Sequence, residues 1–100
     1  MGVLDMIINV TLEDIAVALS TDKNAFVSRS CPVYQALKRN GFKNISVSAF
    51  VAHIEGKTIW LPKKVHKVTR ASRQDWNLIK PFSFKLNVKA LTHEPNTTSN

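Results

Sequence analysis

The chain has 100 residues, of which 44% are hydrophobic and 21% charged, and it contains 14 Lys and Arg, 7 Asp and Glu, and one cysteine. This length predicts a single domain over residues 1–91, followed by a polar tail at 92–100 that we expect to be disordered. An enzyme with separate cofactor and substrate domains is excluded, and the apolar content suffices for a buried core without a disulfide or a metal.

The formal net charge of +7 is concentrated in the second half of the chain. Residues 1–55 contain five Lys or Arg and five Asp or Glu, whereas residues 56–100 contain nine Lys or Arg against Asp75 and Glu94. Such asymmetry favours a polyanionic partner. A basic surface that only keeps the protein in solution is the alternative interpretation.

Cysteine content and hydropathy indicate the cellular compartment in which we expect the protein. The single Cys31 cannot form an internal disulfide, and there is no charged leader followed by an apolar stretch and a cleavage site. No apolar run approaches the roughly 20 residues that span a bilayer. We therefore expect a cytoplasmic protein that has no membrane contact.

The first third of the chain predicts one strand and two helices. A β-branched run at residues 6–10 predicts the strand. Thr11, with Asp14 three residues later, forms the pattern of a capping box and predicts that a helix begins at Leu12. A second helix is expected between Pro32, which suits a first turn, and Gly41, with Ser30 or Cys31 at its cap position.

Two further strands are predicted after Gly41. Residues 44–54 alternate between two sides and predict one long strand, on which His53 shares a side with Val47 and Val51 and is expected to be a hydrogen-bonded structural histidine. Residues 55–56 supply a tight turn, and residues 58–61 return as the partner strand of a hairpin.

A third helix is predicted to start at Pro62 and to run toward residue 79, with Pro81 favouring an earlier end. At about 100° per residue, its apolar side chains fall on one face and its basic side chains on the other. The basic face is formed by Lys63, Lys67, Arg70 and Gln74, flanked by Lys64 and Arg73. Residues 82–88 then alternate as a strand with one core face and one basic face.

The element order β-α-α-β-β-α-β predicts a small α+β domain. We expect one mostly antiparallel sheet of about four strands with helices on one face. The strand at residues 82–88 is expected to lie at an exposed edge, which makes it a candidate surface for a homodimer.

Catalytic signals are few. Cys31 stands at a predicted helix N-terminus, where the helix dipole lowers a thiol pKa, so a thiol-dependent enzyme is a minor alternative. The flanks of the thiol proteases are absent. His53, His66 and His93 have no metal-ligand spacing, and the isolated glycines form no phosphate loop. We therefore predict a protein that is not an enzyme and that uses no cofactor or metal.

The basic residues of the second half are the remaining candidate site. They would bind phosphates by releasing condensed counterions. Trp60 or Phe50 would stack a base if exposed, whereas Trp76, Phe82 and Phe84 are expected in the core. The predicted partner-binding residues are Lys57, Lys63, Lys64, Lys67, Arg70, Arg73, Lys85 and Lys89.

Short motifs along nearly the whole ordered chain form a recognisable set. They are Ile8-Asn9-Val10-Thr11, Asp14-Ile15, Cys31-Pro32-Val33, Ala36-Leu37 with Arg39, Leu61-Pro62 with Val65, and Pro81-Phe82-Ser83-Phe84 with Leu86. Together they resemble a set of small uncharacterised proteins encoded by phages and prophages. The resemblance implies no activity and no site residues. Such proteins often have a second cysteine or a glycine before the Cys-Pro pair, and this chain has neither at residues 27–30.

The resemblance implies a location in the host cytoplasm and a role as a small accessory protein that occludes a host machine. Two hypotheses follow. In the first, the basic helix binds a polyanion directly, either nucleic acid or a nucleoprotein complex. In the second, the protein is a stoichiometric inhibitor that docks on a nucleic-acid-handling host protein complex, such as a defence complex (anti-CRISPR-like) or a transcription complex.

Overall fold

The computed structural model describes residues 5–22, 24 and 26–87, and the predicted tail lies outside this part of the chain. Its elements follow the predicted order except that one predicted strand is divided into two, and the α+β class is confirmed. They are β1 (Asp5–Val10), α1 (Leu12–Leu19), the 3-10 helix η1 (Val27–Arg29), α2 (Pro32–Arg39), β2 (Ile45–Val47), β3 (Val51–Ile54), β4 (Lys57–Trp60), the 3-10 helix η2 (Lys63–Val65), α3 (His66–Thr69), the 3-10 helix η3 (Arg73–Leu78) and β5 (Phe82–Asn87).

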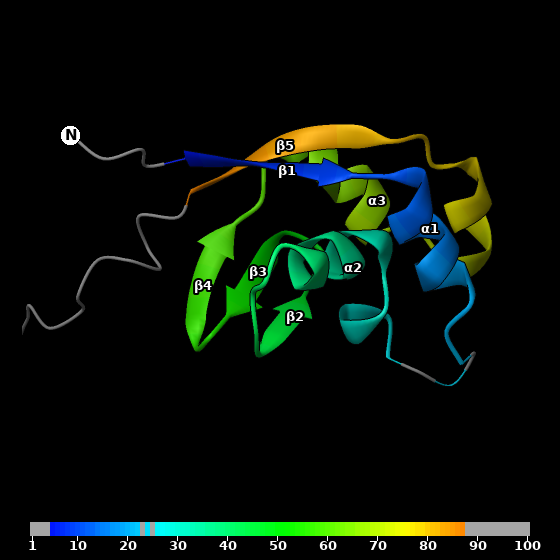
Figure 1. Ribbon diagram of the computed structural model, residues 1–100, viewed down its shortest axis with the longest axis horizontal. Helices are drawn as coiled ribbons and strands as arrows, with labels where there is room; N and C mark the ends of the chain where they lie inside the picture. The colour runs from blue at the N-terminus through cyan, green and yellow to red at the C-terminus, as the bar shows by residue number, and fades with distance from the viewer. Residues whose placement is uncertain (1–4, 23, 25, 88–100) are drawn as a thin grey trace, which may run out of the picture.

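The described strands form two antiparallel sheets rather than the single sheet expected from the sequence. β1 pairs with β5, with Ile8 opposite Phe84, and β2, β3 and β4 form the second sheet in that order. Figure 1 shows the β1–β5 pair along one side of the molecule and the three shorter strands at the other. Helix α2 contacts both β1 and β2, so it joins the two sheets through a shared core.

The predicted long strand at residues 44–54 is divided into β2 and β3 by a tight turn. The Ser48 amide donates to the Val51 carbonyl at 2.8 Å, which closes the turn and folds the two halves against each other. The turn also resets the alternation, because Val47 and Ala52 are both buried. His53 consequently lies on the exposed side, where its Nδ1 is 3.0 Å from the Thr58 hydroxyl.

The predicted hairpin turn at residues 55–56 is confirmed. β3 and β4 pair antiparallel, and Ile54 lies opposite Lys57. Glu55 and Gly56 both have positive φ, at 51° and 82°. Two consecutive positive φ angles are the signature of a type I′ turn, whose twist matches the twist of the strands it connects.

The core lies between the two sheets and the helices. Its largest fully buried side chains include Trp76, Ile8, Leu37 and Ile54, and Phe84 is almost fully buried. Trp76 and Phe84 were expected there, whereas Phe82 is only half-buried at the margin. Trp76 comes from η3, so this short element is held by a large apolar anchor.

The predicted third helix does not continue to residue 79. After η2 and α3 the helix ends at Arg70, Ser72 is extended with ψ at 159°, and η3 begins at Arg73. Thr69 Oγ1 donates to the Ala49 carbonyl at 2.6 Å and also lies near the Val65 and His66 carbonyls. Hydroxyl groups that compete in this way for backbone carbonyls weaken a helix. The break turns the basic residues before it and after it in different directions.

Candidate functional site

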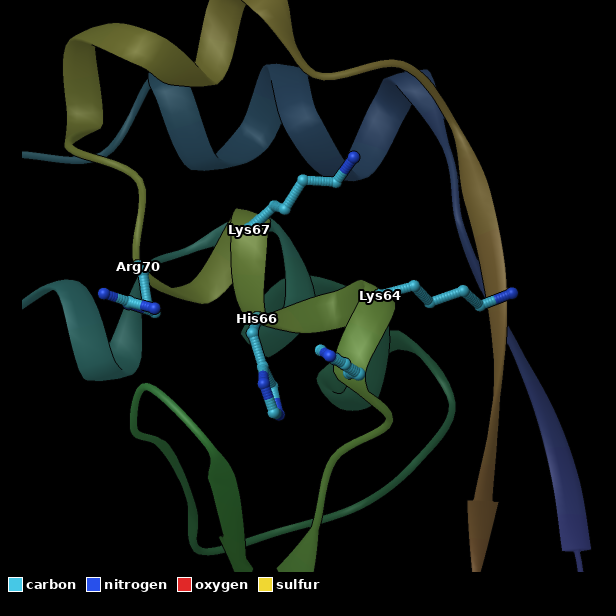
Figure 2. A pocket seen from close by; sticks show the side chains of 5 residues that line it. Lys64, His66, Lys67 and Arg70 are labelled. Carbon is cyan, nitrogen blue, oxygen red and sulfur yellow. The ribbon is translucent and has the colours of Figure 1, made fainter.

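The segment between Pro62 and Arg70 forms an open hollow of about 780 Å³. We call this site the basic hollow, and its lining residues are Lys63, Lys64, His66, Lys67 and Arg70. Figure 2 shows the labelled side chains fanning outward from η2 and α3. The four Lys and Arg side chains are exposed and His66 is half-buried. The sequence predicted Lys63, Lys67 and Arg70 on one face with Lys64 flanking it, and the structure places all four around the basic hollow.

Two valines hold the basic hollow in position. Val65 is fully buried and Val68 is 8% exposed, and both belong to the core that lies under η2 and α3. Their spacing of three residues puts them on one face, so Lys67 between them and the neighbouring Lys64 and Arg70 project to solvent. The predicted separation of an apolar face from a basic face is therefore confirmed as far as Arg70.

An aromatic side chain from the β2–β3 turn packs against two residues of the basic hollow. The Phe50 ring meets the His66 ring edge-on, with centroids 4.9 Å apart, and the Arg70 guanidinium carbon is 5.6 Å from the Phe50 centroid. His66 Nε2 is also 3.0 Å from the Leu61 carbonyl oxygen, which suits an N–H donor at this nitrogen. Phe50 nevertheless keeps 45% of its surface exposed.

Sequence reasoning did not assign His66 to this site. The available signal was its position between Lys64 and Lys67, four residues before Arg70, which is the spacing of neighbours on one helix face. The contact of Phe50 with this face depends on the turn after β2. No local pattern in the sequence carried that information.

The charge of the basic hollow is of one sign. No Asp or Glu in the described residues is among those that line it. Four cations from one short segment repel one another, and an anion bound among them relieves that repulsion. The arrangement therefore suits a ligand that carries several negative charges.

Two of the other predicted site residues, Lys57 and Lys85, do not line the basic hollow. Lys57 is half-buried in β4, opposite Ile54. Lys85 is exposed on the outer face of the β1–β5 sheet, opposite Ile7. Lys89 lies outside the described residues.

Arg73 is directed into the protein rather than toward the basic hollow. Its guanidinium donates to the carbonyl oxygens of Leu19 at 3.0 Å and Asp22 at 3.2 Å, to the Thr21 hydroxyl at 2.9 Å, and to the Thr21 carbonyl. It also lies 5.7 Å from the Trp76 ring centroid. These contacts explain Arg73 as a structural residue, and we leave it out of the candidate site.

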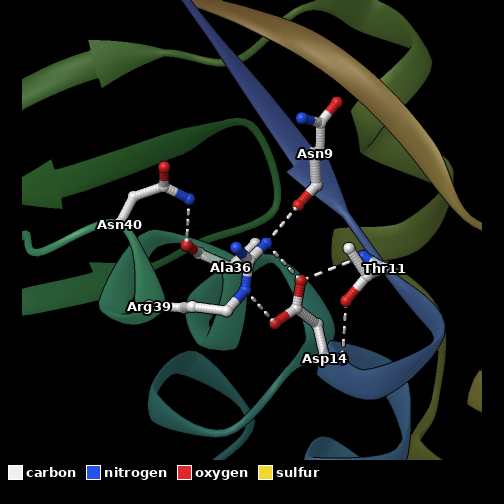
Figure 3. A network of polar contacts seen from close by, with 6 residues as sticks. All are labelled: Asn9, Thr11, Asp14, Ala36, Arg39 and Asn40. Carbon is white, nitrogen blue, oxygen red and sulfur yellow. Dashed lines mark hydrogen bonds and ion pairs between the residues drawn. The ribbon is translucent and has the colours of Figure 1, made fainter.

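A second charged cluster joins α1, α2 and β1 (Figure 3). Arg39 contacts the Asp14 carboxylate through two nitrogens, at 2.9 Å and 3.0 Å, and donates to the Asn9 carbonyl at 2.7 Å. Asp14 also accepts from the Thr11 amide at 2.9 Å, while the Thr11 hydroxyl accepts from the Asp14 amide, so the predicted capping box is confirmed. The cluster is internally satisfied and holds the two helices together.

Cys31 forms the N-cap of α2, one of the two residues predicted for that position. Its Sγ accepts from the Tyr34 amide at 3.4 Å, and the residue is 1% exposed. Burial raises the pKa of the Cys31 thiol, and the hydrogen bonds from backbone amides only partly offset that effect. A nucleophilic thiol needs exposure and a lowered pKa, so the geometry gives the thiol-enzyme hypothesis no support.

Comparisons with protein-family models, with curated proteins and with solved structures found no match to this chain. Among residues 5–22, 24 and 26–87, no three His, Cys, Asp or Glu side chains are placed to hold a metal ion. None of the helices in that part of the chain has the length and apolar character that crossing a lipid bilayer requires. The described residues thus form a small α+β domain with a basic hollow, and the Phe50 ring packs against two of its lining residues.

Proposed function

We propose that this protein binds nucleic acid by accommodating backbone phosphates in the basic hollow. The observation that carries the proposal is the clustering of Lys63, Lys64, Lys67 and Arg70 around one open hollow that no described carboxylate lines. The charge asymmetry of the chain supports it, because the whole excess of +7 comes from residues 56–100.

Phosphate binding by such a surface is driven by counterion release. Each phosphate neutralised by a lysine or arginine frees condensed cations, so the logarithm of the affinity falls linearly with the logarithm of the salt concentration. Contacts of this kind position a protein on the backbone without reading bases. We therefore expect binding without sequence specificity, with a salt dependence set by the four cations.

The decisive experiment is a salt titration of binding to labelled random-sequence oligonucleotides. Steep weakening between about 50 and 200 mM salt is expected for the native protein. Lys67→Glu combined with Arg70→Glu should remove binding. The matched control is Lys38→Glu with Lys43→Glu, which changes the net charge equally at exposed positions away from the basic hollow and should retain binding to a much greater degree.

Failure to bind either single or double strands at about 50 mM salt overturns this proposal, since electrostatic contacts are strongest there. The competing hypothesis of a stoichiometric inhibitor has its own readout. A stable complex recovered from nuclease-treated host lysate, lost in the Lys67→Glu and Arg70→Glu protein but kept in the control, would assign the basic hollow to an acidic protein surface instead.

A further inference from the structure

Two residues with exposed aromatic side chains, Phe50 and Trp60, lie at the end of the β3–β4 ladder that leads into the basic hollow, and the proposed function gives neither a role. Phe50 is 45% exposed and Trp60 is 75% exposed. Val51 pairs with Trp60 across β3 and β4, and the Leu61 amide donates to the Phe50 carbonyl at 2.9 Å. Both aromatics therefore lie at the same end of the β3–β4 ladder, next to the entry into η2.

The two rings face opposite sides of this sheet end. Phe50 packs toward α3, where it contacts His66 and Arg70. Trp60 faces away from the core, because its neighbours Ile59 and Leu61 are buried and successive side chains of a strand alternate. A ligand that touches the basic hollow and both rings must therefore bend around the end of the ladder.

We infer that the nucleic acid is single-stranded and that its bases stack on Phe50 and Trp60 while its phosphates occupy the basic hollow. This inference rests on the proposed function and names its substrate class. Duplex DNA has a persistence length of about 150 base pairs and keeps its bases stacked inside, so it neither follows the bend nor offers a base face to a ring. A single strand does both.

Phe50 is also held ready for such contact. The Ala49 carbonyl accepts from Thr69, and the Phe50 ring contacts His66 edge-on and lies under the Arg70 guanidinium, so part of its side-chain freedom is already restricted before a base arrives. Arginine beside an aromatic ring adds a cation–π contribution to base binding. Exposed aromatics together with a cationic groove are the usual composition of single-strand binding sites.

The test compares a labelled oligothymidylate of about 15 nucleotides with a duplex of the same length, at one salt concentration. The native protein should bind the single strand more tightly. Phe50→Leu and Trp60→Leu should each weaken single-strand binding by about 5- to 150-fold, the range expected for one stacked base, and should weaken duplex binding by a much smaller factor. Trp60→Phe should retain most of the single-strand affinity that Trp60→Leu loses.

Phe26→Leu is the matched control, because Phe26 is 77% exposed and precedes η1, outside the basic hollow. Intrinsic fluorescence supplies a second readout: Trp76 is fully buried, so quenching by the oligothymidylate should disappear in Trp60→Phe. Equal affinity for single and double strands with no effect of Phe50→Leu or Trp60→Leu overturns the inference and leaves the proposed function intact. Failure of the native protein to bind either the single strand or the duplex would instead overturn the proposed function itself.

Discussion

The Arg73 guanidinium donates a hydrogen bond of 3.0 Å to the carbonyl oxygen of Leu19, the last residue of α1. The final carbonyls of a helix have no partners within the helix, and its carboxyl end carries partial negative charge. Helix α1 has no basic residue in its own last turn. Arg73 supplies the missing cation from 54 residues further along the chain and thereby fixes η3 against α1.

We predict that Arg73→Ala lowers the free energy of unfolding by about 2–3 kcal/mol, because several charge-assisted hydrogen bonds are lost together. Urea denaturation measures this change. Lys67→Ala, at an exposed position, should change stability by less than about 0.5 kcal/mol. Nucleic-acid binding should show the reverse order, with Lys67→Ala the weaker binder. A folded, fully stable Arg73→Ala protein that binds poorly would return Arg73 to the binding surface.

Local patterns predicted most of what is local in this fold. The Thr11 and Asp14 capping box, the Cys31 cap and the turn at Glu55 and Gly56 each depend on residues within three positions, and all are confirmed. The basic face before Arg70 followed in the same way from helical spacing.

Contacts between segments that are distant in sequence determine the features that local patterns did not predict. The helical pattern after Arg70 was interrupted because Thr69 binds the Ala49 carbonyl and Arg73 binds the end of α1. The place of Phe50 beside the basic hollow likewise depends on the turn that divides β2 from β3. Periodicity cannot show such contacts, since each joins segments whose separation in sequence is large.

The pairing of Asp14 with Arg39 predicts a dependence of stability on acid pH. Burial alone would raise the pKa of Asp14, but the hydrogen bonds from Arg39 and Thr11 outweigh it and lower the pKa below the ordinary value of 3.8. Stability from a carboxylate with a lowered pKa is fully present above the unfolded value and is lost as pH falls through the folded value.

Thermal unfolding of the native protein and of Asp14→Asn measures this contribution. At neutral pH the variant should be less stable by about 2 kcal/mol, because charge-assisted hydrogen bonds to a buried group are lost. The difference should shrink as pH falls below 3.8, where the native carboxylate becomes protonated. A gap that stays constant down to about pH 2 would contradict the assigned direction of the pKa shift.

The turn between β3 and β4 offers a stabilising substitution. Glu55 has a φ of 51°, a conformation that costs most L-residues roughly 1 kcal/mol and that asparagine tolerates best. Glu55→Asn creates the Asn-Gly pair favoured in type I′ turns and should raise stability by about 0.5–1 kcal/mol in urea denaturation. Gly56→Ala should lower it, because its φ of 82° strains any side chain although no atom lies within 4 Å of the added Cβ. Destabilisation by Glu55→Asn would contradict this turn assignment.

The reactivity of the buried Cys31 thiol tests the hypothesis that the protein is a thiol-dependent enzyme. The side chain is 1% exposed, caps α2 through the Tyr34 amide, and has a raised pKa because of burial. Iodoacetamide at neutral pH should therefore label Cys31 in the native protein more slowly than it labels free cysteine, and labelling should become fast in denaturant, as measured by mass spectrometry. Native labelling faster than that of free cysteine would indicate an exposed, activated thiolate and would restore Cys31 as a candidate nucleophile.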